Sequence, residues 1–214
     1  MHYTPGYAYP LLVWLHGPGC DERQLMRIMP MVSIRNHVGI APRGTVISPL
    51  CQSGDEPPVY GWSHDERGLH EAEQRVFDAI ESAFRGFNIH PRRVFLAGFD
   101  TGGTLAFRLA MNHPYKFAGV ISLGGPLPCG GAPLARLPEA RQLSIFLGVG
   151  RRGQVYDESH VCENLRLLHT AGMSITLRAY PCGHEISPQM LSDVDAWIIE
   201  QITSAKANVD AATV

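Results

Sequence analysis

Three short segments carry side chains that could do chemistry, and each follows an aliphatic run. They are WLHGPGC (14–20), GFDTGG (98–103) and PCGHEIS (181–187). The second segment offers the carboxylate of Asp100, and the third offers the imidazole of His184. A carboxylate and an imidazole that meet can support hydrolysis, with the carboxylate as nucleophile or base and the imidazole activating water.

Aliphatic runs that are continuous rather than alternating precede these segments, and such runs are typical of strands buried on both faces. The expected strands are LLVWL (11–15), VGIAPRGTVI (38–47), VFLAGF (94–99), FAGVISLGG (117–125), LSIFLGVG (143–150) and SITLRAY (174–180). Amphipathic patterns predict helices over 69–87, 101–114, 158–172 and 187–206. This alternation predicts an α/β fold, with a mostly parallel central sheet and helices on both faces.

The turn at GFDTGG is predicted to be a tight strand-to-helix turn with Asp100 at its tip. Small neighbours are needed there, and Gly98, Gly102 and Gly103 provide them. Ligands of parallel sheets bind beyond the carboxyl ends of the strands. We therefore expect Asp100 and His184 to face the same pocket.

These segments together resemble the phospholipase/carboxylesterase branch of the α/β-hydrolases, and the chain is also similar to dienelactone-hydrolase-like proteins. The resemblance covers nearly the whole chain and rests on YPLLVWLHG, GWSHDE with the long helix after it, NIHPRRVFLAGFDTGG, FAGVISLGG and PCGHEIS. It implies one α/β-hydrolase domain over residues 1–214, without a cap domain or cofactor, acting on a small ester-like ligand. Longer members carry strands before the first aliphatic run, so N-terminal strands are expected to be missing here, through truncation or a shortened fold.

The resemblance assigns His184 outright, but the chain departs from the family pattern at three other positions. Asp100 stands where the family has a nucleophilic serine, and Gly153 stands where it has the acid of the triad. Asp157 is the nearest substitute for that acid and is expected to orient His184. Without a hydroxyl at the turn, acyl transfer of the serine type cannot begin.

The third departure concerns the loop Gly17, Pro18 and Gly19, which the resemblance identifies as an oxyanion-binding loop. The first donor of that loop would be Pro18, which has no N–H. The amide of Thr101, followed by that of Gly102, would survive as a second donor. Losing one donor is expected to lower turnover by about two to three orders of magnitude.

Three functions remain open from the sequence. The first is a carboxylesterase-like or dienelactone-hydrolase-like enzyme of weak or altered activity, with Asp100 as nucleophile or base. The second is an inactive pseudo-hydrolase that binds a ligand or partner, with Asp100 capping the following helix. The third is an Asp-nucleophile hydrolase of the dehalogenase or epoxide-hydrolase type. Thr101 after the aspartate and the short span from Gly125 to Ser144, which leaves no room for a full cap, count against the third.

Composition limits the remaining classes. The formal net charge of -2 and a pI near 6.5 do not indicate a surface that binds nucleic acid. No apolar run approaches the roughly 18 to 20 residues of a membrane span. Five scattered cysteines fit reduced thiols and a cytoplasmic protein, and without close ligand spacing no metal site is predicted. The polar stretch 51–68 is expected to be an irregular loop, and the assembly is expected to be a monomer or a homodimer.

Overall fold

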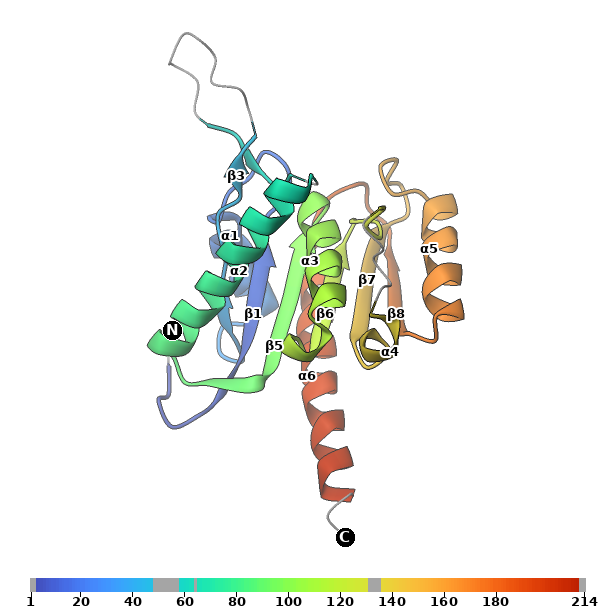
Figure 1. The fold of residues 1–214 in the computed structure, drawn as a ribbon. Coiled ribbons are helices and arrows are strands. Elements are labelled where there is room, and N and C mark those ends of the chain that lie inside the picture. The colour runs from blue at the N-terminus through green and yellow to red at the C-terminus, as the bar shows by residue number, and fades with distance from the viewer. Residues whose placement is uncertain (1–2, 48–57, 64, 131–135, 212–214) are drawn as a thin grey trace.

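A central parallel sheet organises the molecule (Figure 1). The computed structural model describes residues 3–47, 58–63, 65–130 and 136–211. Its six-stranded sheet has the order β2-β1-β5-β6-β7-β8, and neighbouring strands all run parallel. The strands are β1 (Tyr9–Leu15), β2 (Val38–Ile40), β5 (Ile89–Phe99), β6 (Gly119–Leu123), β7 (Ser144–Gly150) and β8 (Ser174–Tyr180). The predicted parallel sheet is confirmed.

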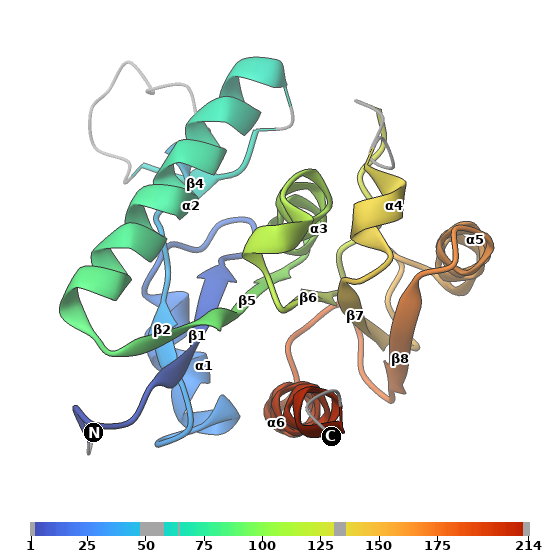
Figure 2. The same ribbon diagram turned by 60° about the horizontal axis from the view of Figure 1, so that its bottom comes forward.

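Helices cover both faces of the sheet, as predicted (Figure 2). The helices are α1 (Gln24–Val32), α2 (Glu66–Gly86), α3 (Thr101–Asn112), α4 (Leu137–Ala140), α5 (Glu158–Thr170) and α6 (Pro188–Ala211), and η1 (Pro114–Lys116) is a 3-10 turn. Helices α2, α3 and α5 pack on one face, where they share one apolar core with the strands. Helices α1 and α6 pack on the other face and enclose a second core.

Helix α1 was not predicted from the sequence. Pro30 lies inside it, and a proline cannot donate the backbone hydrogen bond that a helix interior requires. The signal that could have found α1 is a row of apolar residues at helical spacing, and that row is buried against the sheet and α6. The row consists of Leu25, Ile28, Met29 and Val32.

The run expected to form a strand over 38–47 is divided in two. Only β2 joins the main sheet, while β3 (Thr45–Val46) pairs antiparallel with β4 (Tyr60–Gly61) away from it. Pro42 lies between β2 and β3 and has no N–H to continue a ladder. The predicted loop 51–68 lies partly outside the described residues, and α2 begins within it at Glu66.

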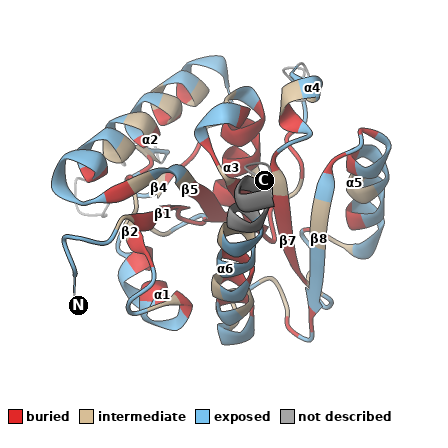
Figure 3. Ribbon diagram, turned by 90° about the horizontal axis from the view of Figure 1, so that it is seen from below, coloured by how far each residue is buried: buried red, intermediate tan, exposed pale blue. Residues whose placement is uncertain are grey.

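Burial follows this architecture. Every residue of β1 is buried, because β1 has neighbours on both edges and helices on both faces (Figure 3). The edge strand β8 is more exposed. Between Gly125 and Ser144 the described residues contain one helix, the four-residue α4. Among the described residues, no helix combines the length and the apolar character needed to cross a membrane.

Candidate active site

The turn between β5 and α3 consists of Asp100 alone. Its backbone has φ 53° and ψ −120°, and within the described ranges it is the only residue other than glycine with a positive φ. Such a conformation costs about 1–3 kcal/mol and persists only where the surroundings hold it. Here the Asp100 N–H donates to the carbonyl of Leu123 at 2.9 Å, and its carbonyl accepts from Thr104 N–H at 3.0 Å. The predicted tight turn is confirmed.

Glycines allow the strands and α3 to approach closely around this turn. A Cβ at Gly98 would lie 2.4 Å from the backbone of Gly102. A Cβ at Gly102 would lie 2.3 Å from the carbonyl oxygen of Leu15 at the end of β1. The first turn of α3 is therefore pressed against the end of β1, and its leading N–H groups, on Thr101 and Gly102, have no acceptors within the helix.

The carboxylate of Asp100 contacts the imidazole of His184. The distance from Oδ2 to Nε2 is 2.5 Å, and the side chains are 16% and 21% exposed, so solvent can still reach the pair. The carboxylate makes no capping hydrogen bond to α3, so the prediction that Asp100 caps this helix is wrong. The side chain points across the sheet edge to His184 instead.

His184 lies in the loop between β8 and α6. Ser187 accepts the N–H of Met190 at 3.2 Å and so caps α6, as its position before Pro188 suggests. The His184 ring lies 5.1 Å from the ring of Phe99, with 35° between the planes. The loop after β8 thus carries His184 to Asp100 at the end of β5, although β6 and β7 lie between these two strands in the sheet.

The loop after β1 is organised by Gln24, a residue of α1. The Oε1 atom of Gln24 accepts from Trp14 Nε1 at 2.7 Å and from the N–H of Gly17 at 3.2 Å. The amide of Gly17 is therefore already bonded, Pro18 has none, and Gly19 adopts φ 69°. Gln24 was missed by the sequence reasoning, although a buried polar residue beside the apolar row of an amphipathic helix would have been a signal.

Comparison with known proteins identifies the family of this chain. The model of the phospholipase/carboxylesterase family matches residues 6–202. The chain belongs to the phospholipase/carboxylesterase family. It is 22% identical over 219 residues to acyl-protein thioesterase 1 of Cryptococcus neoformans, a match covering 89% of this chain and 92% of that relative.

Solved structures of other proteins have the same fold as this chain. SOBER1 of Arabidopsis thaliana superposes with a TM-score of 0.75 at 23% identity, covering 91% of this chain and all of that chain. The carboxylesterase of Bacillus cereus gives a TM-score of 0.72 at 18% identity, covering 90% of this chain and 89% of that chain. The fold is the α/β-hydrolase fold, as the sequence predicted.

The expected acid of this family member does not contact His184. The carboxylate of Asp157 caps α5 through the N–H of His160 at 3.0 Å and also contacts His160 Nδ1 at 2.9 Å. Both hydrogen bonds lower the pKa of Asp157, and the bond from the backbone N–H of His160 has the larger effect. The prediction that Asp157 orients His184 is therefore not supported. A Cβ at Gly153 would lie 3.8 Å from the backbone nitrogen of His184, so the position where the resemblance implies an acid adjoins the site but lacks a side chain.

His16, the buried histidine of the loop after β1, has a structural role, because both of its ring nitrogens bond to backbone groups. Its Nε2 accepts from the N–H of Gly44 at 3.0 Å, so its proton is on Nδ1, which donates to the carbonyl of Gly17 at 3.0 Å. Burial lowers its pKa. His16 is therefore a neutral tautomer that ties the loop to the segment before β3.

In the part of the chain that the structure describes, no metal site lies beside Asp100 and His184. Among the described residues, no group of three or more His, Cys, Asp or Glu side chains could hold a metal ion. Cys20 contacts the amide nitrogen of Gln24 at 3.4 Å, and Cys182 is buried. The four described cysteines are unpaired, and Cys51 lies outside the described residues.

Proposed function

We propose that this protein hydrolyses small esters or lactones with weak or altered activity, using Asp100 and His184. One observation carries the proposal: the Asp100 carboxylate stands at a strained turn, 2.5 Å from the His184 imidazole and directly before the amides of α3. A helix N-terminus favours an ionised carboxylate, the form that can attack carbon. The notable difference from a serine hydrolase is that the attacking atom needs no deprotonation.

In the first step, an Oδ atom of Asp100 attacks the carbonyl carbon of the ester and forms a tetrahedral oxyanion. The N–H groups of Thr101 and Gly102 are the donors at hand for that charge. When the intermediate collapses, the bond to the leaving oxygen breaks, and the departing oxygen takes the Nε2 proton of a protonated His184. The products of this step are the free alcohol, a neutral imidazole and a mixed anhydride on Asp100.

In the second step, neutral His184 takes a proton from water as the water oxygen attacks the anhydride. The anhydride bond breaks, and the carboxylic acid leaves. The aspartate carboxylate and the protonated imidazole are regenerated, so one ester and one water have become one acid and one alcohol.

The chemistry of the first step limits the substrates. A carboxylate is a better leaving group than an alkoxide, so the tetrahedral intermediate from a simple alkyl ester returns mainly to reactants. A phenolate, an enolate or a thiolate leaves more readily. We therefore expect turnover of phenyl esters, enol lactones and thioesters, and little turnover of ethyl esters.

The test is a single turnover of a phenyl ester in oxygen-18 water, with parallel samples quenched in hydroxylamine. Water can attack either carbonyl of the anhydride, so two signals in the peptide carrying Asp100 are measured by mass: oxygen-18 in its carboxylate and a hydroxamate at its side chain. Either signal supports the covalent route. Turnover that leaves neither signal overturns it. Asp78→Asn, on α2, serves as the matched control variant.

Binding without hydrolysis is the second candidate, and the loop after β1 favours it. The Gly17 amide is bonded to Gln24, and Pro18 provides no donor, so the loop offers less to an oxyanion than the family pattern would. If no phenyl ester, enol lactone or thioester turns over while an ester analogue shifts the His184 resonances in NMR spectra, the protein is a ligand-binding member of the family.

A further inference from the structure

The imidazole of His184 contacts two residues from the ends of neighbouring strands. The ring of Phe99 lies with its centroid 5.1 Å from that of the imidazole, at 35° between the planes. At Gly124, an added Cβ would lie 3.0 Å from His184 Cε1 and 3.3 Å from Nδ1. The imidazole is thus packed against an aromatic ring and a bare backbone.

Phe99 is itself held in place. A Cβ at Gly17 would lie 2.6 Å from Phe99 Cδ1, and a Cβ at Gly124 would lie 3.5 Å from Phe99 Cε2. Since both positions are glycine, the ring fills the space between the loop after β1 and the end of β6. The Phe99 ring is therefore packed against both of these backbones.

Gly124 has the conformation that this contact requires. Its φ is +66°, which favours glycine, and its N–H donates to the carbonyl of Gly148 on β7 at 2.8 Å. The backbone beside His184 is therefore fixed by the register of β6 and β7. A side chain at Gly124 would be strained and would press against the imidazole.

We propose that Phe99 and Gly124 are positioning residues that hold His184 so that Nε2 faces Asp100, in place of the triad acid. The carboxylate at Asp157 is bonded to His160, and Gly153 has no side chain to orient the ring. Packing against the Phe99 ring and the Gly124 backbone limits the rotation of the imidazole, which an acid on Nδ1 would otherwise control. The geometric part of this proposal stands without catalysis, and its kinetic part rests on the proposed function.

Phe99→Leu tests the proposal, because it keeps apolar volume and removes the flat face. Two-bond proton–nitrogen NMR spectra at alkaline pH report which ring nitrogen of His184 carries the proton, and His184→Gln assigns the signals. We expect one tautomer, protonated at Nε2, in the parent protein and in Phe99→Tyr. In Phe99→Leu we expect signals averaged between the tautomers. An unchanged single tautomer in Phe99→Leu overturns the proposal.

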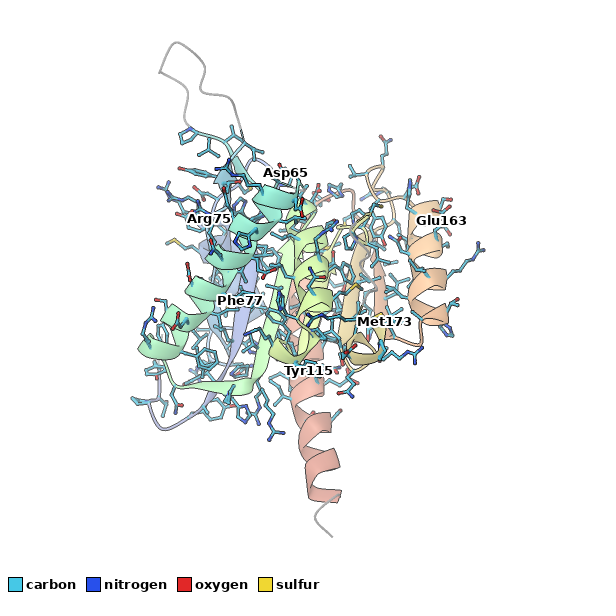
Figure 4. All side chains as sticks on the ribbon, in the orientation of Figure 1. Asp65, Arg75, Phe77, Tyr115, Glu163 and Met173 are labelled. Atoms are coloured by element: carbon cyan, nitrogen blue, oxygen red, sulfur yellow. The ribbon has the colours of Figure 1, made fainter. Side chains whose placement is uncertain are left out.

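Phe77→Leu is the matched control, since it is the same substitution outside the site. Figure 4 labels Phe77 on α2, where its ring packs against His113 and Phe117. If Phe77→Leu averages the tautomers to the same extent as Phe99→Leu, the effect is general loosening and the proposal fails. Unfolding curves of both variants establish that each is folded under the conditions of the spectra.

Kinetics separate this proposal from the proposed function. On a phenyl ester, Phe99→Leu should lower kcat by about 10- to 100-fold through misplacement of the imidazole, with little change in KM, and Phe99→Tyr should restore it. If the parent protein turns nothing over, the proposed function fails while the tautomer spectra still decide the positioning. If turnover is present but kcat is unaffected by Phe99→Leu, the positioning role fails and the proposed function stands.

Discussion

The carboxylate of Asp100 lies 2.5 Å from Nε2 of His184, although 84 positions of sequence separate the two residues. In a serine triad the acid contacts Nδ1 and the nucleophile contacts Nε2. Here the carboxylate occupies the nucleophile's side of the ring, and Nδ1 lies toward Gly124 instead of an acid. The carboxylate of Asp100 therefore occupies the position of the nucleophile and is also the ionic partner of His184.

Replacement of the carboxylate oxygen should abolish the proposed reaction. An amide nitrogen and oxygen are poor nucleophiles, so Asp100→Asn is expected to lower kcat on a phenyl ester by at least about 100-fold. Steady-state kinetics with Asp78→Asn as control measure this. Activity of Asp100→Asn within a few-fold of the parent protein would rule out Asp100 as nucleophile.

A hydroxyl at position 100 should change the substrate range. In Asp100→Ser, the hydroxyl would face Nε2 of His184, and attack would give an ester instead of an anhydride. We expect this variant to hydrolyse ethyl esters faster than the parent protein and to accumulate an acyl group at position 100, detected by mass. A fully inactive but folded variant would mean that the loop of Gly17 and Pro18 cannot support acyl transfer.

The loop after β1 should depend on Gln24. Gln24→Met keeps the shape of the side chain but leaves the Trp14 Nε1–H and the Gly17 N–H without their acceptor. Each buried, unpaired donor costs about 1–3 kcal/mol, so the free energy of unfolding should fall by about 2 kcal/mol or more. Urea denaturation measures this, with exposed Gln74→Met on α2 as control. Equal stability of the two variants would contradict the role of Gln24.

The approach of α3 to β1 should make Gly102 irreplaceable. Its Cβ would lie 2.3 Å from a backbone oxygen, which cannot move as a side chain can. Gly102→Ala is expected to cost about 1–3 kcal/mol of unfolding free energy or more. Gly86→Ala, at the end of α2 with nothing within 4 Å, should be neutral or slightly stabilising. Similar stability losses in both variants would refute the close-approach explanation.

The buried His37 should make stability depend on pH. Burial lowers its pKa, although Asp195 on α6 lies 2.6 Å from Nε2 and opposes the shift. Below the ordinary histidine pKa of about 6.5, the unfolded chain binds a proton that the native chain resists, so acid favours unfolding. The unfolding free energy should fall from about pH 8 to about pH 5.5.

That fall should be smaller in His37→Gln. His16 titrates in the same direction, so part of the fall should persist. His169→Gln, exposed on α5, is the control variant. Urea denaturation at several pH values measures the three curves. A curve for His37→Gln that runs parallel to the parent curve would exclude His37 as a source of the pH dependence.

Local sequence was enough for the elements and the turn. Aliphatic runs predicted all the strands of the main sheet, most clearly the central ones such as β1, because a strand buried on both faces needs apolar residues at every position. Glycines around Asp100 predicted the tight turn, because only small residues fit there. Helix α1 escaped because Pro30 obscured its pattern, and the run 38–47 divided because Pro42 cannot continue a ladder.

The family, the fold and the two residues that had to meet therefore follow from the order of residue types along the chain. The contacts of each side chain follow from how the chain packs in three dimensions. Asp157 follows the right strand but is bonded to the neighbouring His160, and Asp100 crosses to His184 instead of capping its own helix. Backbone conformation follows local residue types, whereas the partner of a polar side chain depends on which distant groups the packed sheet brings within about 3 Å.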